Sequence, residues 1–417
     1  MPQTFAEKIL AKKAQLPETR AGQIVEITPD VILSHDNTAP IYGLFQRMGG
    51  KKVFNPEMHA IILDHATPAP STKHAENHRI TREFVKDQGI SNFYDIGKGI
   101  CHQILVEAGL ALPGEVVLGS DSHTPHAGVM GTFAAGIGRT EMASIWAIGQ
   151  IWLRVPESMK ITVRGRLPEG VTSKDLALYI IGDQKADGAL YMSVEWHGEA
   201  IQALPLSQRA TLTNLMAEMG AKNSYIPPDQ VVFDYLKDRA RRDYEAVYPD
   251  PDARYAVKKE YDGNKIEPMI ACPHTVDHVK PLSKVEGTPI DQAFLGTCTN
   301  GRLDDLAAAA AILDGRKIAP GKRMIVIPAS ETIYLEALQA GYLETFLKAG
   351  ALVESPGCGP CMGNHMGVPA VGEVSISTAN RNFQGRMGTK ESEVYLASPA
   401  VVAASAVAGV IRHPKDI

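Results

Sequence analysis

The chain has 417 residues, of which 44% are hydrophobic and 21% charged, and its formal net charge is −5. This length allows more than one globular domain, at roughly 100 to 200 residues each. Because both signs of charge are mixed along the chain, no basic stripe is available for a phosphate backbone, and we expect no nucleic-acid partner.

The start of the chain and its cysteine content indicate the compartment. The first fifteen residues, MPQTFAEKILAKKAQ, predict a charged amphipathic helix rather than a signal peptide. No apolar run approaches the roughly 18 to 20 residues that cross a membrane. Five cysteines, an odd number, argue against a disulfide framework. We therefore expect a cytoplasmic protein without membrane contact, in which an important cysteine binds a metal or takes part in catalysis.

Short apolar runs alternate with helical patterns in the first third of the chain, which predicts parallel strands joined by crossover helices. In such sheets the chemistry gathers where the strands end. Asp64 and His65 follow the run HAIIL, and Asp121, Ser122 and His123 follow EVVLGS. Eight of the thirteen histidines lie within the first 126 residues. This third of the chain is therefore a candidate catalytic surface.

Changes in composition divide the rest of the chain. The sequence becomes more polar after VPESMKITVRGRLPEG, and strand–helix alternation returns in the last third with DQAFLGTCTN and RMIVIPAS. We predict domains at residues 1–157, 158–285 and 286–417. The closing helix should begin at Ser398-Pro399, because serine is a good N-cap and proline suits the first helical position.

The stretch ESPGCGPCMGNHMG contains Cys358 and Cys361 at the spacing of a dithiol redox site. Such a site needs a helix after its first cysteine, since the helix dipole lowers the thiol pKa. Three glycines and one proline stand in residues 363–372, and in a helix glycine costs about 1 kcal/mol and proline about 3 kcal/mol. We therefore reject disulfide exchange. Glycines on both sides of Cys358 suit a loop that approaches a bound group closely.

Cys298, in FLGTCTNG, follows a predicted strand and gives the Cys-x-x-Cys pair a third partner. Three thiolates can hold a [4Fe–4S] cluster whose remaining iron keeps an open position and acts as a Lewis acid. The alternative is a closed structural zinc site, which would need a fourth ligand such as His365. The residues favour the cluster. Cys101 and Cys272 have no comparable neighbours, and their role stays open.

Five motifs in one order, GICHQ, GSDSHT, GTCTNGR, GCGPCMG and NRNFQGR, resemble the aconitase superfamily along nearly the whole chain. Within it the sequence is similar to the large subunits of the 3-isopropylmalate dehydratase and homoaconitase families. The resemblance implies an α/β, three-domain, aconitase-like architecture with parallel-type sheets flanked by helices. It also implies that Cys298, Cys358 and Cys361 bind a [4Fe–4S] cluster.

The resemblance further implies roles in a reaction that moves a hydroxyl between adjacent carbons of a hydroxy acid by dehydration and rehydration. It assigns catalysis to six residues: Asp64, His65, His102, Asp121, His123 and Glu195. It assigns substrate binding to four others: Ser122, Asn380, Arg381 and Arg386. Arginine forks suit a substrate with two or three carboxylates. The stretch HDNT, residues 35–38, lies where family members differ.

Single-chain aconitases carry their serine base on a further, swivelling domain, which this chain lacks. The resemblance therefore implies a partner, a separate small subunit that supplies this domain in a heterodimer or heterotetramer. The leading hypothesis is a 3-isopropylmalate dehydratase large subunit in leucine biosynthesis, and a homoaconitase is the nearest alternative. An RNA-binding regulator stabilised by a cluster or by zinc is an alternative of another class, which the absence of a basic patch disfavours.

Overall fold

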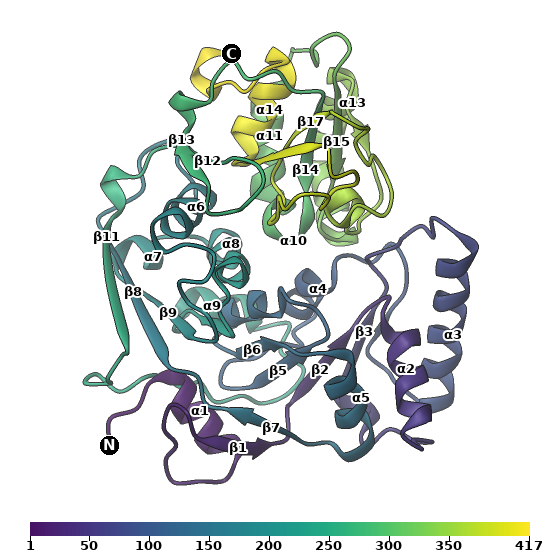
Figure 1. Cartoon of the computed structure of the whole chain (residues 1–417), viewed down its shortest axis with the longest axis vertical. Coiled ribbons are helices and arrows are strands. Elements are labelled where there is room, and N and C mark those ends of the chain that lie inside the picture. Colours follow the sequence, from purple (N-terminus) through teal and green to yellow (C-terminus); the bar gives the residue numbers. More distant parts are fainter.

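The computed structural model covers residues 1–417 and contains three sheets of four or more strands. The first and third sheets lie on opposite sides of the short helices α4 (Cys101–Glu107), α8 (Leu206–Leu215) and α10 (Thr297–Asn300), and the four-stranded sheet lies beside them (Figure 1). A fourth pairing joins β1 (Ile24–Ile27) to β7 (Ile151–Arg154) in an antiparallel ribbon. No helix is long and apolar enough to cross a membrane.

The first sheet has the strand order β4-β3-β2-β5-β6, and all its strands are parallel. Its three central strands are apolar and buried along their length, as expected for a sheet covered on both faces. The strands are β2 (Val31–Ser34), β3 (His59–Ile62), β4 (Phe93–Tyr94), β5 (Val116–Gly119) and β6 (Phe133–Gly136). The helices of this region are α1 (Phe5–Lys13), α2 (Thr38–Arg47), α3 (Thr72–Gln88), α4 (Cys101–Glu107) and α5 (Arg139–Ile148).

The second sheet has the order β10-β9-β8-β11 and is also entirely parallel. Its strands are β8 (Ser158–Arg164), β9 (Ser193–His197), β10 (Asn223–Tyr225) and β11 (Val257–Asp262). Its helices are α6 (Ser173–Gln184), α7 (Glu199–Gln202), α8 (Leu206–Leu215) and α9 (Gln230–Leu236), and a 3-10 turn, η3 (Met216–Met219), extends α8.

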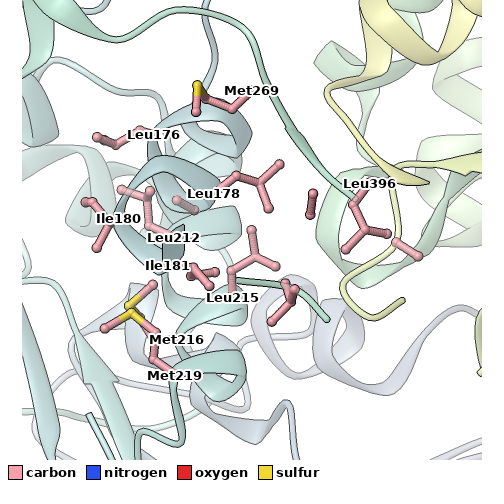
Figure 2. Packing of buried hydrophobic residues seen from close by; sticks show 14 of the residues in the cluster. Leu176, Leu178, Ile180, Ile181, Leu212, Leu215, Met216, Met219, Met269 and Leu396 are labelled. Carbon is pink, nitrogen blue, oxygen red and sulfur yellow. The ribbon is translucent and has the colours of Figure 1, made fainter. Parts of the chain in front are cut away.

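Helix α6 is the centre of the largest apolar core, and its side chains meet those of α8 and η3 (Figure 2). The cluster also takes in Met269 and Leu396, which belong to strands of the third sheet. Burying each large apolar side chain contributes about 1.5 to 3 kcal/mol. This core therefore fixes the position of α8 relative to the third sheet.

The third sheet has seven strands in the order β13-β12-β18-β17-β14-β15-β16. β12 pairs antiparallel with both its neighbours, and all other pairings are parallel. The strands are β12 (Met269–Ala271), β13 (Val279–Pro281), β14 (Gln292–Gly296), β15 (Arg323–Ile327), β16 (Leu352–Val353), β17 (Val374–Ser377) and β18 (Glu393–Leu396). The helices are α10 (Thr297–Asn300), α11 (Leu303–Leu313), α12 (Glu331–Gln339), α13 (Tyr342–Ala349) and α14 (Pro399–Ala408).

The α/β class with parallel sheets flanked by helices is confirmed, and α14 begins after an extended Ser398 with proline at its first position. The charged segment that follows Ile226 is helical only in α9. β12 and β13 join the third sheet although they precede residue 285. The three domain ranges remain a prediction.

Candidate active site and cluster site

Two loops at the carboxyl ends of strands carry four of the six predicted catalytic residues. Asp64 and His65 follow β3, and Asp121 and His123 follow β5; these two strands flank β2. Because the strands are parallel, both loops lie at one edge of the sheet. His65 Nδ1 lies 2.6 Å from Asp64 Oδ1, and its Nε2 lies 3.5 Å from Asp121 Oδ2. The fold therefore brings the two loops into contact.

Asp121 is the carboxylate that the histidines share. His102 Nε2, on α4, lies 2.7 Å from Asp121 Oδ1, and the backbone N–H of His123 donates to the same oxygen at 2.8 Å. Burial alone would raise the pKa of Asp121, but His102, His123 and His65 outweigh it and hold that pKa well below 3.8. A single ionised carboxylate thus orients imidazoles from three segments.

Asp36, in the stretch whose role the sequence left open, holds the loop after β3. Its carboxylate accepts backbone N–H groups of Asp64, His65 and Ala66 at 2.9, 2.7 and 3.1 Å. His78 Nε2, from α3, lies 2.8 Å from the same carboxylate. Three donors on one side chain fix the direction in which the Asp64–His65 pair leaves the strand.

The neighbouring His35 packs its ring on that of His65, with 3.9 Å between the ring centroids. Its Nδ1 is buried and has no hydrogen-bond partner. Burial, followed by the charge on His65, lowers the pKa of His35 to about 4. His35 is therefore a neutral ring that supports a charged one.

We expect the ion pair of His65 to appear in the pH dependence of stability. Burial alone would lower the pKa of His65, but Asp64 and Asp121 raise it well above 6.5. A raised folded-state pKa adds stability that is complete below the unfolded pKa and is lost as pH rises through the folded pKa. The destabilisation caused by Asp64→Asn, measured as the midpoint of urea unfolding, should thus be larger at about pH 6 than at about pH 9.

The matched control is Asp95→Asn, which removes an exposed carboxylate paired with Arg82 at 2.7 Å. Its small effect should be the same at both pH values, because neither partner titrates between them. A cost of Asp64→Asn that does not change with pH would contradict the assignment of His65 as a cation.

Glu218, at the end of η3, joins two of the predicted site residues. Its Oε1 lies 2.7 Å from His123 Nε2, and Arg381 Nε donates to its two oxygens at 2.8 and 3.0 Å. Burial alone would raise the pKa of Glu218, but His123 and Arg381 lower it. The buried carboxylate of Glu218 thus binds both the imidazole of His123, from the region of the first sheet, and the guanidinium of Arg381, from the region of the third.

The sequence pointed to Glu195 for such a role, and the structure does not bring Glu195 to this group. Its oxygens accept the N–H of Phe5 at 3.0 Å and the hydroxyl of Tyr255 at 2.9 Å. They tie β9 to the N-terminal helix. The sequence did contain a signal for Glu218, which is the one acidic residue in the apolar segment ATLTNLMAEMG. An acid in such a segment is expected to be buried, and a buried charge needs a partner.

The remaining predicted substrate residues lie around this group. Arg381 makes its hydrogen bonds to Glu218 through Nε alone. Arg386 has a buried Nε without a partner. Ser122 is exposed beside Asp121. Lys174, which the sequence did not single out, donates from α6 to the carbonyls of residues 378 and 379 at 2.9 and 2.6 Å, and so holds the loop that leads to Arg381.

The three predicted metal ligands are all buried, at the junction between α8 and the third sheet. Asn214 Nδ2, on α8, donates to Cys298 Sγ at 3.2 Å. Asn380 lies between two of the cysteines, with Nδ2 at 3.7 Å from Cys298 Sγ and Oδ1 at 3.6 Å from Cys361 Sγ. Two amides thus contact the sulfur atoms of this buried group, which fits a sulfur-ligated centre.

The spacing of the sulfurs separates the two kinds of metal centre. Tetrahedral zinc with Zn–S bonds of about 2.3 Å places its sulfur ligands roughly 3.8 Å apart. Cys298, Cys358 and Cys361 form no group whose sulfurs all lie within 4.8 Å of one another. In a cluster each cysteine binds a different iron, so its ligands stand farther apart. His365, the candidate fourth zinc ligand, instead has its Nε2 3.0 Å from the carbonyl oxygen of His65.

The Cys358 loop is packed directly on the catalytic loop. The N–H of Cys358 donates to the carbonyl of Asp64 at 2.8 Å. Gly359 follows with a φ of +55°, and a Cβ there would meet Ile327 Cδ1 at 2.2 Å. Only glycine fits this turn without displacing its neighbour. The glycines beside Cys358 thus serve close packing against the protein itself.

Comparison with known proteins gives the class of this chain. The sequence matches the model of the aconitase family (aconitate hydratase) over residues 7–288 and 278–409. The chain belongs to the aconitase family, as its motifs indicated. A solved structure, the holo-form of Thermococcus kodakaraensis aconitase X, aligns over 86% of this chain and 84% of its own, with 12% identity and a TM-score of 0.48.

The curated relatives include proteins named as large subunits of 3-isopropylmalate dehydratase and of homoaconitase. A Methanothermobacter thermautotrophicus protein named probable 3-isopropylmalate dehydratase large subunit is 50% identical and covers 100% of both chains. The 3-isopropylmalate dehydratase large subunit 1 of Methanopyrus kandleri is 48% identical over 100% of this chain and 99% of its own. A probable methanogen homoaconitase large subunit of M. thermautotrophicus is 48% identical over 99% of this chain and 97% of its own.

Proposed function

We propose that this chain is the large, cluster-binding subunit of a cytoplasmic hydro-lyase that isomerises a malate-type hydroxy acid, as a 3-isopropylmalate dehydratase does in leucine biosynthesis. The observation that carries this proposal is the single network in which Asn380 touches Cys298 and Cys361 while the adjacent Arg381 shares Glu218 with His123. Two adjacent residues of one loop, Asn380 and Arg381, thus connect the candidate metal ligands to the pair of His123 and Glu218.

The cysteines fit a [4Fe–4S] cluster, with Cys298, Cys358 and Cys361 as its ligands. When bound, such a cluster would supply a Lewis acid for the departing hydroxyl through its fourth iron. Burial raises the pKa of Cys298 to about 12, so the neutral thiol would release a proton as it binds a metal centre. The same burial keeps water away from the ligands.

The histidines are the candidate acids and bases of the reaction. Dehydration removes a hydroxyl, which leaves more readily when a positioned acid protonates it. Glu218 holds His123 and Asp121 holds His102, and each carboxylate fixes the direction of its imidazole. His65 lies against Asp121 from the neighbouring loop. Rehydration uses the same groups in the opposite direction.

The arginines bind the carboxylates of the substrate. Arg381 is held at Nε by Glu218, and its outer N–H groups can form a bidentate pair. Arg386 brings a second, half-buried guanidinium whose Nε needs an acceptor. Two fixed forks select a diacid over a monoacid, because a missing carboxylate leaves one of them unpaired.

A homoaconitase-type activity on a longer tricarboxylic acid is the second candidate. The observation that favours it is the 48% identity to a homoaconitase large subunit over nearly the whole chain. Both candidates need the same cluster, histidines and arginines and differ only in the substituent of the substrate. A panel of alkenes with alkyl and carboxyalkyl substituents separates them.

We expect the chain to bind its cluster alone and to hydrate alkenes only after a small subunit is added, because no residue here matches the family's serine base. Closure by the partner also removes water, which strengthens each charge interaction. A stable complex should bury at least about 1,000 Å². The test is a titration of the anaerobically reconstituted chain with its partner while alkene hydration is followed. Full activity of this chain alone would contradict the proposal that the active site is divided between two subunits.

A further inference from the structure

Arg302 is a buried cation to which the proposed reaction gives no role. It ends the motif GTCTNGR, and its side chain is only 7% exposed. All hydrogen bonds of its guanidinium go to neutral acceptors. Nη1 donates to the carbonyl of Cys298 at 2.7 Å, and Nη2 donates to Thr211 Oγ1 at 2.7 Å and to the carbonyl of Thr299. A buried cation is costly unless an anion compensates it.

The one carboxylate within 4 Å of the guanidinium nitrogens belongs to Asp305, and it compensates the charge only in part. Its Oδ2 lies 3.7 Å from Arg302 Nη2, which is an ion pair without a hydrogen bond. The same Oδ2 accepts the backbone N–H of Arg302 at 3.0 Å, and Oδ1 accepts Asn300 Nδ2 at 2.9 Å. The hydrogen bonds of Asp305 thus serve the start of α11, and the guanidinium can still stabilise a second anion nearby.

The turn that Arg302 binds is strained. Helix α10 has only four residues, Thr297–Asn300, and Thr297 has a φ of +75°, which is an outlier for a β-branched residue. The last carbonyl groups of a helix have no partner within it and need other donors where they are buried. Arg302 supplies donors to two of them, the carbonyls of Cys298 and Thr299. The guanidinium therefore holds the backbone of a predicted cluster ligand in an unfavourable conformation.

Arg302 also joins this turn to α8. Thr211 Oγ1, on α8, accepts from Arg302 Nη2 and donates to the carbonyl of Thr299 at 2.9 Å. Three residues later on α8, Asn214 Nδ2 donates to Cys298 Sγ at 3.2 Å, and its Oδ1 accepts from Thr299 Oγ1 at 3.1 Å. The contact between Asn214 and the sulfur thus depends on the spacing of two helices that Arg302 ties together.

The bonds and the charge of Arg302 act on a sulfur-ligated cluster in the same direction. Hydrogen bonds to the sulfurs and the net charge around a cluster are two of the influences that set its reduction potential. Burial raises the pKa of Cys298, whereas the Asn214 amide and the charge of Arg302 both act to lower it. Both groups therefore favour negative charge on this sulfur, and a cluster gains negative charge when it is reduced.

We propose that Arg302 is a positioning residue of the cluster, which holds Cys298 against Asn214 and whose charge raises the reduction potential of the cluster. The proposal rests on the proposed function, because the cluster is assigned there. A cluster with a higher potential gives up an electron less readily. When a mild oxidant such as ferricyanide takes one electron from the cluster, one Fe²⁺ leaves, so Arg302 would slow the loss of the open iron.

The first measurement is the reduction potential of the anaerobically reconstituted full chain, titrated with dithionite and followed by the paramagnetic resonance of the reduced cluster. Arg302→Met removes the charge and the donors from a side chain of similar length. At a fixed potential it should lower the ratio of reduced to oxidised cluster at least about tenfold, a shift of about 59 mV for one electron. Arg302→Lys keeps the charge and should recover at least half of that shift.

The matched control is Arg209→Met, the same change at another buried arginine, on α8 itself. Arg209 donates to the carbonyls of Leu204 and Gln202 at 2.9 and 2.7 Å and pairs with Asp229 at 2.8 Å, and none of these partners belongs to α10. We expect Arg209→Met to lower the thermal stability of the chain and to leave the potential of the cluster unchanged. A merely structural role of Arg302 would give the same result.

The second measurement is the rate at which ferricyanide and a chelator remove iron from Arg302→Lys, which keeps the charge but loses the fork that binds the turn. This rate should be at least about threefold higher than in Arg209→Lys, and it decides the proposal if Arg302→Met retains no cluster. An unchanged potential in Arg302→Met, an equal shift in Arg209→Met, or equal iron loss from both lysine variants overturns the proposal. Absence of iron and labile sulfide from the unaltered chain refutes the cluster itself, so the two failures are distinguishable.

Discussion

Glu218→Gln should lower kcat by about 10²- to 10⁴-fold, which is the usual contribution of a positioned acid or base. Glutamine has nearly the shape of glutamate but no charge, so His123 loses the carboxylate that holds its imidazole. Arg381 also loses its anchor, and KM for the diacid should rise as well. The measurement is alkene hydration by the chain reconstituted with its small subunit, expressed per cluster.

Glu195→Gln is the matched control, because it makes the same chemical change at another fully buried glutamate. Its carboxylate contacts Phe5 and Tyr255, so we expect lower stability and a kcat within about threefold of the unaltered chain, less than 1 kcal/mol in the barrier. A large loss of kcat in Glu195→Gln together with normal turnover in Glu218→Gln would restore the assignment made from the sequence.

Cys298→Ala, Cys358→Ala and Cys361→Ala should each reduce the retention of iron and labile sulfide by at least about tenfold. Even residues that only support metal ligands contribute about 10- to 100-fold in metal affinity, and a lost ligand costs more. The measurement is iron, zinc and acid-labile sulfide per chain after anaerobic reconstitution. In the unaltered chain, mild oxidation should release one iron per cluster, because three cysteines leave one iron without a protein ligand.

The controls are Cys101→Ala and Cys272→Ala, two other buried cysteines of the same chain. Cys101 lies at the start of α4, and its N–H donates to Asp64 Oδ2, a bond that alanine retains. Both variants should keep the full amount of iron and sulfide. Stoichiometric zinc without sulfide in the unaltered chain, or equal loss of iron in all five variants, would refute the cluster assignment.

Local chemistry in the sequence was enough to predict the α/β class and the strand ends that carry Asp64, His65, Asp121 and His123. Apolar runs of four or five residues have to be buried on both faces, and polar residues directly after them have to emerge at the sheet edge. The glycines and the proline after the Cys-x-x-Cys pair were enough to predict that this segment does not form the helix of a redox site. The ordered motifs indicated the family, and the matches over residues 7–288 and 278–409 agree with them.

Only the tertiary structure decided which buried charges meet. Glu195 and Glu218 are both isolated acids in apolar surroundings, and nothing local distinguishes the one that meets Phe5 from the one that meets His123 and Arg381. Those partners lie 95 and 163 residues from Glu218, so their contact depends on how α8 packs against two sheets. Pairs so distant in sequence follow from the packing of whole elements, because a buried charge is stable only where the fold brings its partner.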